Sequence, residues 1–324
     1  MKPFLKKVAL AALACAPMLA PAAYPERPIP MYVSYSPGGG TDLVARAIAP
    51  YIEKYLGHGA RIVVMNKPGA GGAIGFTQIA NAAPDGYTIG FINTPNVITS
   101  PIERDAGFTL DKIDPLANII DDPDGFSVRT DSPVKNLDDL AALARKRPGE
   151  ITVGTTGVGS DDHLAMMLFE RIAKVKLNHI PMKGAADVRT GIQGGQIDVA
   201  AMNVGEAMQA IAGSAPMRQL CSMSAKRTSL SPDLPTFAEQ GYPIEMSSLR
   251  GIGAPKGLPP DVRAALVKAI DQAAHDPEFQ KACVKYYAPL RYLNDKEFAA
   301  VLHKADGDFR QLWKEMPWAE SARR

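Results

Sequence analysis

The feature that most constrains this fold is a strand, a glycine-rich loop and a helix start that occur twice in the same order. The first copy is VSYSPGGGTD (33–42), and the second, roughly 120 residues later, is ITVGTTGVGSDD (151–162). A helix start carries backbone N–H groups without intrahelical partners and a partial positive charge, and glycine lets a ligand approach the backbone closely. Each junction therefore predicts a place where main-chain donors hold an anion.

One such junction is also typical of an ordinary turn, in which an Asp or Ser caps the following helix. The matched pair favours a binding site instead. Two helix starts that face each other across a cleft would hold two carboxylates, or one carboxylate and a polar group.

Other anion-binding and catalytic motifs are incomplete. GGGTD lacks the lysine of a phosphate-binding loop, and in PGAGGAIG (68–75) Ile74 stands where a dinucleotide motif needs its third small residue. Ser160 is followed two positions later by Asp162, whereas a nucleophile elbow has glycine there. His163 would lie in the first turn of a helix with no second histidine nearby, and we interpret it as a cap or packing residue. The sequence therefore predicts no cofactor and no metal site.

Strands and helices alternate along most of the chain, which predicts βαβ units and mostly parallel sheets. The expected strands are 29–36, 60–66, 84–93, 126–130, 150–156, 177–182 and 196–203. The expected helices follow the first loop, lie within 67–81, 132–149, 157–174 and 184–195, and close the chain at 260–274 and 295–313.

The α/β pattern also predicts how the chain divides into domains. A second α/β unit begins after DDPDG (121–125), and the pattern loosens beyond LCSMSA (220–225). We therefore expect lobe 1 to combine 23–124 with 224–324, and lobe 2 to be the inserted segment 125–223. Two crossings, near 125 and near 223, would form a hinge, and two hinged lobes suggest a clamp that closes on a ligand.

The N-terminus has the plan of a secretory signal peptide. Three lysines in the first seven residues precede the apolar run VALAALACAPMLA and the small residues 20–23. We expect cleavage after Ala22 or Ala23, with a lipid-attached Cys15 and a buried N-terminal helix as the weaker alternatives. Without residues 1–22 the chain has 33 basic and 34 acidic residues, a net charge of −1, and no basic face suited to nucleic acid.

The mature chain would keep two cysteines, Cys221 and Cys283. Export makes a disulfide between them conceivable, but two cysteines 62 residues apart match neither a disulfide framework nor a metal site. The sequence leaves their pairing open.

The acidic residues of the two loops need a separate interpretation, because a carboxylate beside a bound carboxylate would repel it. We assign Asp42 a structural role, in which it caps its helix and fixes the loop. Asp42, Asp161 and Asp162 would contact the ligand directly only if the ligand carries an amine or a hydroxyl. Lys183 and Arg250 are cations that could reach the cleft, but each is expected to be a solvated surface charge.

Together these segments resemble the Bug-type receptors, the periplasmic solute-binding components of tripartite tricarboxylate transporters. The resemblance spans almost the whole mature chain and is carried by several motifs together. The matching segments are 24–29, 36–49, 63–91, 153–165, 181–200, 231–243 and 253–262, among them SPGGGTDLVARAIA, VGTTGVGSDDHLA and PMKGAADVRTGIQGGQIDVA.

The resemblance implies a type II periplasmic-binding-protein fold, with a ligand carboxylate between the two loops held by backbone amides, hydroxyls and bridging waters. We expect a monomer whose closed form is recognised by membrane transporter subunits or by a sensor, both encoded elsewhere. Carried over position by position, the implied ligand-binding residues are Tyr35, Ser36, Pro37, Gly38, Gly39, Gly40, Thr41, Asp42, Thr155, Thr156, Gly157, Gly159, Ser160, His163, Lys183, Gly184, Ala185 and Asp198.

The chain departs from the family pattern in the variable part of the pocket. Met182 stands before Lys-Gly where an aromatic residue is frequent, and Leu249-Arg250 stands where many members have tryptophan. The leading hypothesis is thus a non-enzymatic periplasmic receptor for a small carboxylate, either a dicarboxylate or an aromatic acid. The alternatives are an exported hydrolase that uses Ser160 and His163, and an enzyme of carboxylate metabolism, against which the signal peptide argues.

Overall fold

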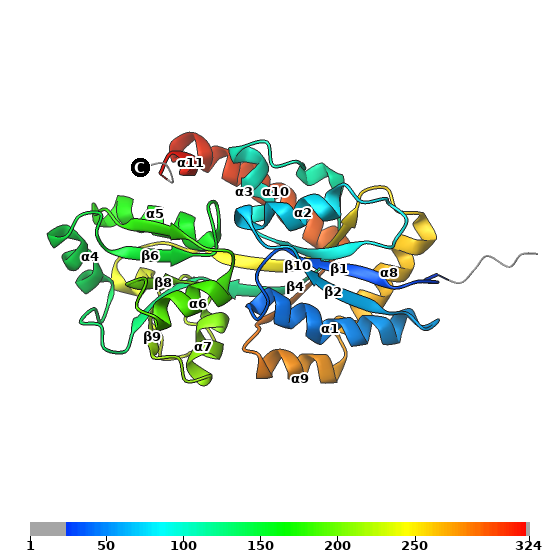
Figure 1. Ribbon diagram of the computed structural model, residues 1–324, viewed down its shortest axis with the longest axis horizontal. Coiled ribbons are helices and arrows are strands. Elements are labelled where there is room, and N and C mark those ends of the chain that lie inside the picture. Colours follow the sequence, from blue (N-terminus) through cyan, green and yellow to red (C-terminus); the bar gives the residue numbers. More distant parts are fainter. Residues whose placement is uncertain (1–23, 322–324) are drawn as a thin grey trace, which may run out of the picture.

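The computed structural model describes residues 24–321. The chain forms two lobes, each built around one β-sheet (Figure 1). Lobe 1 has six strands in the order β11-β4-β10-β3-β1-β2, and lobe 2 has five in the order β7-β6-β8-β5-β9. The expected two-lobed α/β fold is confirmed. The predicted signal peptide, with Cys15, lies outside the described residues.

The elements of lobe 1 come from both ends of the described chain. They are β1 (Ile29–Val33), α1 (Gly40–Leu56), β2 (Ile62–Asn66), η1 (Ala70–Gly72), α2 (Ala73–Ala80), β3 (Ile89–Asn93), α3 (Asn96–Glu103), η2 (Leu110–Lys112), β4 (Ile113–Pro123), β10 (Ser247–Pro255), α8 (Pro260–Ala274), α9 (Pro277–Lys285), β11 (Leu290–Asn294), α10 (Asp295–Glu315) and α11 (Trp318–Ser321).

The elements of lobe 2 form one continuous stretch between β4 and β10. They are β5 (Gly125–Arg129), α4 (Leu137–Lys146), β6 (Thr152–Thr155), α5 (Asp161–Ala173), β7 (Asn178–Pro181), α6 (Ala185–Gln193), β8 (Val199–Ala201), α7 (Val204–Ala212), β9 (Met217–Ser222) and η3 (Ala238–Gln240).

The strands that precede the two glycine loops sit in the parallel part of each sheet. β1 pairs in parallel with β2 and β3, and β6 pairs in parallel with β7 and β8. The carboxyl ends of these strands therefore meet at one edge of each sheet, where open α/β sheets bind ligands. The helix after the first loop, α1, buries Val44, Ile48 and Ile52 at four-residue spacing, so its start is fixed against the sheet.

The lobes are joined where three chain segments run side by side. Asp124, between β4 and β5, donates from its backbone N–H to the carbonyl of Met246 and accepts from the N–H of Met223. Residues 224–246 were expected in lobe 1, but Phe237 and Ile244 pack in the core of lobe 2. The return crossing therefore lies near residue 247 rather than 223, because these apolar side chains are buried against the lobe 2 sheet.

Trp318 of α11 is also buried in the lobe 2 core, so the C-terminal helices make a third connection between the lobes. Figure 1 shows α10 and α11 running along the outside from one lobe toward the other. Cys221 and Cys283 are both buried and free, in the cores of different lobes. None of the described helices is long and apolar enough to cross a membrane.

Candidate functional site

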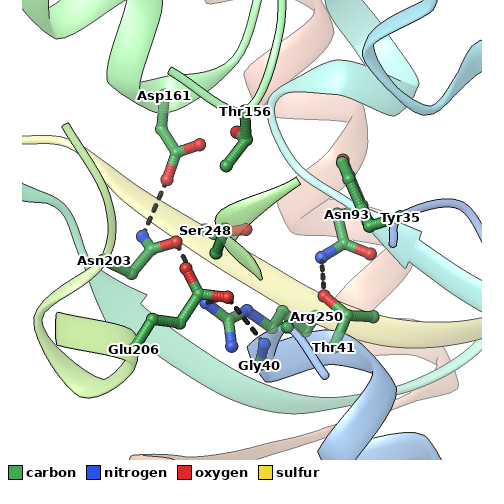
Figure 2. A pocket seen from close by; sticks show the side chains of 12 residues that line it. Tyr35, Gly40, Thr41, Asn93, Thr156, Asp161, Asn203, Glu206, Ser248 and Arg250 are labelled. Atoms are coloured by element: carbon green, nitrogen blue, oxygen red, sulfur yellow. Dashed lines mark hydrogen bonds and ion pairs between the residues drawn. The ribbon is translucent and has the colours of Figure 1, made fainter. Parts of the chain in front are cut away.

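The starts of the predicted helices meet at a cavity between the lobes (Figure 2). Lobe 1 contributes the start of α1 and the ends of neighbouring strands, and lobe 2 contributes the starts of α5, α6 and α7. The cavity holds about 20 Å³, space for about one water molecule. Its walls are formed by Tyr35, Gly39, Gly40, Thr41, Asn93, Thr156, Asp161, Ala185, Asn203, Glu206, Ser248 and Arg250.

Direct contacts between the lobes explain why the cavity is small. The Ser36 hydroxyl donates to Asp187 (2.6 Å), and the Thr99 hydroxyl donates to the carbonyl of Gly159 (2.7 Å). The backbone N–H of Ser36 also donates to the carbonyl of Lys183 (3.3 Å). The structure is thus a closed form of the clamp, and a ligand would enter only after the lobes separate.

The helix start of lobe 1 is occupied by a carboxylate of lobe 2. The backbone N–H of Gly40 donates to Oε1 of Glu206 (2.9 Å), and the same oxygen lies 3.2 Å from a guanidinium nitrogen of Arg250. Glu206 lies in the first turn of α7 and is 8% exposed. The protein's own carboxylate therefore fills the anion position that the first loop predicts.

Arg250 lies at the centre of a buried network. Its guanidinium donates to Asp122 (3.2 Å) and to the side-chain oxygen of Asn203 (2.9 Å), and only 2% of the residue is exposed. The expectation that Arg250 is a solvated surface charge is wrong. It lies on β10, which is covered on both sides, and buried acids compensate its charge.

Asp161 points into the cavity from the start of α5 (Figure 2). One of its oxygens accepts a hydrogen bond from Asn203 (2.8 Å). Burial, and after it the neighbouring Asp162, raises the pKa of the Asp161 carboxyl well above its usual range. Asp161 thus contributes a buried acidic group that would be stabilised in its charged form by a nearby cation.

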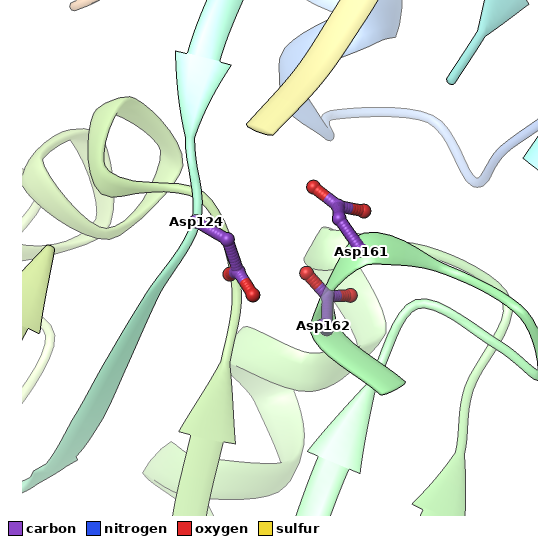
Figure 3. A group of neighbouring side chains, drawn as sticks. All are labelled: Asp124, Asp161 and Asp162. Atoms are coloured by element: carbon purple, nitrogen blue, oxygen red, sulfur yellow. The ribbon is translucent and has the colours of Figure 1, made fainter. Parts of the chain in front are cut away.

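Two further carboxyls lie beside Asp161 and away from the cavity lining (Figure 3). One oxygen each of Asp124, Asp161 and Asp162 lies within 4.8 Å of the others, and all three residues are buried. Burial raises the pKa of Asp162 to about 6 and that of Asp124 well above its usual range. The lobe 2 side of the site therefore holds three buried carboxyl groups, each of which gives up its proton less readily than an ordinary carboxyl.

Some residues of the first glycine loop line the cavity, and others hold the loop in place. Asp42 accepts from the N–H of Gly38 (2.9 Å) and is bonded to Arg46 and Asn66, so it fixes the loop as expected, but it does not cap α1, whose start has no side-chain cap. Pro37 is exposed, and neither it nor Gly38 lines the cavity. The cavity wall is formed instead by Tyr35, Gly39, Gly40 and Thr41.

Of the predicted residues in the second loop, which precedes α5, only Thr156 lines the cavity. Its N–H and hydroxyl both donate to Asp162, which fixes the loop. Thr155 is buried behind it, and its hydroxyl lies 2.7 Å from Nε2 of His179. Gly157 instead closes against lobe 1, since a Cβ there would lie 2.8 Å from the Cα of Gly71.

Ser160 and His163 have the contacts of a helix cap and a packing residue. The Ser160 hydroxyl accepts from the backbone N–H of His163 (3.1 Å), and Nδ1 of His163 accepts from the N–H of Gly159 (3.1 Å). The ring of His163 stacks on His179 with centroids 3.9 Å apart. These contacts do not favour the hydrolase hypothesis, which needs the serine hydroxyl directed at the ring.

The residues predicted around the start of α6 also lie in different surroundings, and only one of them lines the cavity. Ala185 lines the cavity, Lys183 is exposed, and Gly184 lies so near lobe 1 that a Cβ would be 3.1 Å from the nitrogen of Ser36. The resemblance implied that Asp198 binds the ligand, and this is wrong. It precedes β8 and accepts from the N–H and hydroxyl of Thr152, at the opposite end of that strand from the cavity.

Sequence reasoning missed several residues of the cavity wall: Asn93, Asn203, Glu206 and Ser248. Asn93 and Asn203 stand at or just after the carboxyl ends of strands that were predicted, so their position was an available signal. Glu206 and Ser248 lie in elements that the patterns did not predict.

Comparison with known proteins agrees with this architecture. The sequence model of the tripartite tricarboxylate transporter family receptor matches residues 44–304. The UPF0065 protein in the gbd 5' region of Cupriavidus necator is 32% identical over 299 residues, which cover 90% of this chain and 89% of that protein. The protein BugT of Bordetella pertussis is 32% identical over 269 residues, which cover 82% and 80% respectively.

Solved structures of periplasmic binding proteins and their relatives are also similar to this chain. The periplasmic binding protein BugD has a TM-score of 0.85 and 33% identity, covering 91% of this chain and 99% of that one. MatC from Rhodopseudomonas palustris with bound malate has a TM-score of 0.82 and 25% identity over 89% and 99%. Rpa4515 from the same organism with adipate has a TM-score of 0.83 and 25% identity over 90% and 97%.

Proposed function

The chain belongs to the tripartite tricarboxylate transporter receptor family, and we propose that it captures a small organic carboxylate between its lobes for transport. The observation that carries the proposal is the convergence of helix starts from both lobes, α1 with α5 and α6, on one cavity. Helix starts hold carboxylates through unpaired N–H groups. The malate and adipate in the related structures are ligands of this class.

Lobe closure would be the signal that passes to a partner. Separation of the lobes breaks the contacts from Ser36 and Thr99, and a ligand that bridges both lobes replaces them with its own. The closed form would then be recognised by membrane transporter subunits or by a sensor. The receptor would act as a monomer, without a cofactor and without turnover.

Residues 1–22 would direct export of the receptor to the periplasm and would then be cleaved off. N-terminal sequencing of protein from a periplasmic fraction tests this part of the proposal, and a mature chain that begins at Ala23 or Tyr24 is expected. Retention of Met1, or a lipid on Cys15, would contradict it.

Ligand capture is tested by thermal shift and calorimetry with malate, succinate, glutarate, adipate and benzoate, together with amino acids. At least one acid should bind saturably, and ligand at 100 times its dissociation constant stabilises the protein by about 2.7 kcal/mol. Proton NMR of the same mixtures should show the acid unchanged after a day. Failure of every acid to bind, or the appearance of a product, would contradict the proposal.

A further inference from the structure

We infer that the ligand carries a positively charged nitrogen as well as a carboxylate, and that Asp161 and Glu206 bind that nitrogen. This inference rests on the proposed function and narrows its ligand class from small acids to small zwitterions. It is carried by the excess of acidic over basic side chains in the cavity wall, by unpartnered acceptors there and by the occupied helix start.

Acidic side chains outnumber basic ones in the cavity wall. Among its described lining residues, Arg250 is the single base, and Asp161 and Glu206 are both acidic. Arg250 already contacts Glu206 and Asp122, each at 3.2 Å. The positive charge of Arg250 is therefore already balanced by Asp122 and Glu206 and is not left over for the carboxyl of Asp161. A ligand with two carboxylates would add further acidic groups here, whereas a cation would stabilise the charged form of Asp161.

The cavity wall also offers acceptors that need donors. Oε2 of Glu206 and Oδ1 of Asn93 are buried and have no hydrogen-bond partner within residues 24–321. Glu206 and Asn93 are 8% and 3% exposed, so water does not reach these oxygens freely in the closed form. An unsatisfied buried acceptor is costly, and an ammonium group brings three donors. A plain dicarboxylate brings none.

The main-chain anion site of lobe 1 is already taken. Glu206 accepts from Gly40 and contacts Arg250, so a ligand carboxylate at that point must first displace a buried side chain. A cationic nitrogen can bind on the free side of the same carboxylate and leave this contact intact. The ligand's own carboxylate then faces Gly39 and Ala185, at the starts of α1 and α6.

Figure 2 shows that the two acidic residues of the cavity wall lie on the same side of the cavity. Asp161, Asn203 and Glu206 lie on one side, and Tyr35, Thr41 and Asn93 lie on the other. Behind Asp161 lie the buried carboxyls of Asp124 and Asp162 (Figure 3), and a cation bound at Asp161 would favour their charged forms as well. Two basic residues of lobe 2 lie near the first loop: Lys183, which is exposed, and Arg189, which lies near Gly38.

The test compares pairs of acids that differ by one amino group: succinate with aspartate, glutarate with glutamate, adipate with 2-aminoadipate, and propionate with β-alanine. Calorimetry at pH 7.5 with EDTA present should give at least tenfold tighter binding for the amino member of the best-binding pair. Glu206→Gln and Asp161→Asn should each reduce that ratio at least fivefold. The exposed controls Glu150→Gln and Asp131→Asn should leave it unchanged.

In the presence of EDTA, three outcomes would overturn the inference. The plain acid could bind as tightly as its amino partner in every pair, or the ratio could survive both substitutions. Glu206→Gln could also raise the affinity for plain dicarboxylates, which would make Glu206 a stand-in that the ligand displaces. In each case a carboxylate still binds and the proposed function stands. If no compound of either series binds to folded protein, the proposed function fails as well. Binding that requires added Ca²⁺ in place of EDTA would assign the acidic groups to a metal and also overturn the inference.

Discussion

Oε1 of Glu206, on lobe 2, lies 2.9 Å from the backbone nitrogen of Gly40, at the first residue of α1 on lobe 1. The contact joins a carboxylate to the positive end of a helix and crosses the cleft that a ligand must enter. It therefore stabilises the closed form without a ligand, together with the contacts from Ser36 and Thr99.

Glu206→Ala should shift the ligand-free protein toward the open form, because it removes the acceptor for Gly40 and leaves Arg250 with Asp122. Glu206→Gln is the matched control, since its amide oxygen can still accept from Gly40. Small-angle scattering should show a larger radius of gyration for Glu206→Ala than for Glu206→Gln and wild type. Identical scattering from all three proteins would show that this contact does not hold the lobes together.

Gly40→Ala should weaken binding of the preferred ligand at least tenfold. A Cβ at Gly40 would overlap the guanidinium of Arg250 and lie 2.6 Å from Oε1 of Glu206, so the lobes could not close fully. The control is Gly307→Ala in α10, where a Cβ meets no heavy atom within 4 Å. It should leave affinity unchanged and stabilise the helix by up to about 1 kcal/mol. Calorimetry distinguishes the two, and wild-type affinity in Gly40→Ala would contradict the closure mechanism.

The fold could be predicted from the sequence where pattern and packing agree. The parallel βα units around Val33 and Thr155 show strand, loop and helix in order, and both loops reach the cavity as the pattern implies. The C-terminal helix α8 (Pro260–Ala274) matches the predicted range because proline marks its start. β10 was missed because it contains Arg250 and two glycines and is buried on both faces, so it shows no alternation.

The site was less predictable because half of it depends on tertiary contacts. Main-chain donors can be read from glycine spacing, but the partner of Gly40 is Glu206, 166 residues later and in a helix that no pattern marked. Arg250 was assigned to the surface because the sequence does not show Asp122 and Asn203 folding around it. The acidic side chains of the cavity wall, from which we infer a zwitterionic ligand, could therefore only be recognised in the structure.

Acidification should destabilise the protein through the stacked pair His163 and His179. Burial lowers the pKa of His179 to about 4 and that of His163 well below its usual range. The unfolded chain binds a proton on each of these histidines near pH 6.5 and the folded chain does not, so the contribution of this pair to stability is full above pH 6.5 and falls toward pH 4. For His179 alone the loss between pH 7 and pH 5 is at most about 2 kcal/mol.

His179→Phe keeps a flat ring against His163 but cannot titrate, so it isolates this effect. Urea unfolding at pH 7 and pH 5 should show a smaller loss of stability on acidification in the variant than in wild type. Loss of the contact with Thr155 lowers stability at both pH values and cancels in the comparison. An equal pH dependence in the two proteins would contradict the assignment.

Cys221 and Cys283 should remain thiols in the mature protein, because they lie in the cores of different lobes. Burial raises the pKa of Cys283 to about 12 and that of Cys221 well above its usual range, which makes both unreactive in the folded state. A thiol reagent should label neither residue in native protein and both in urea without reductant. Labelling that requires a reductant would reveal a disulfide and contradict the structure.

A crystal structure of the receptor with the compound that binds it most tightly tests ligand capture most directly. We expect one ligand between the lobes, with its carboxylate at the starts of α1 and α6 and its nitrogen within 3.2 Å of Asp161 or Glu206. A ligand bound outside this cavity, or a ligand there that contacts neither helix start, would contradict it.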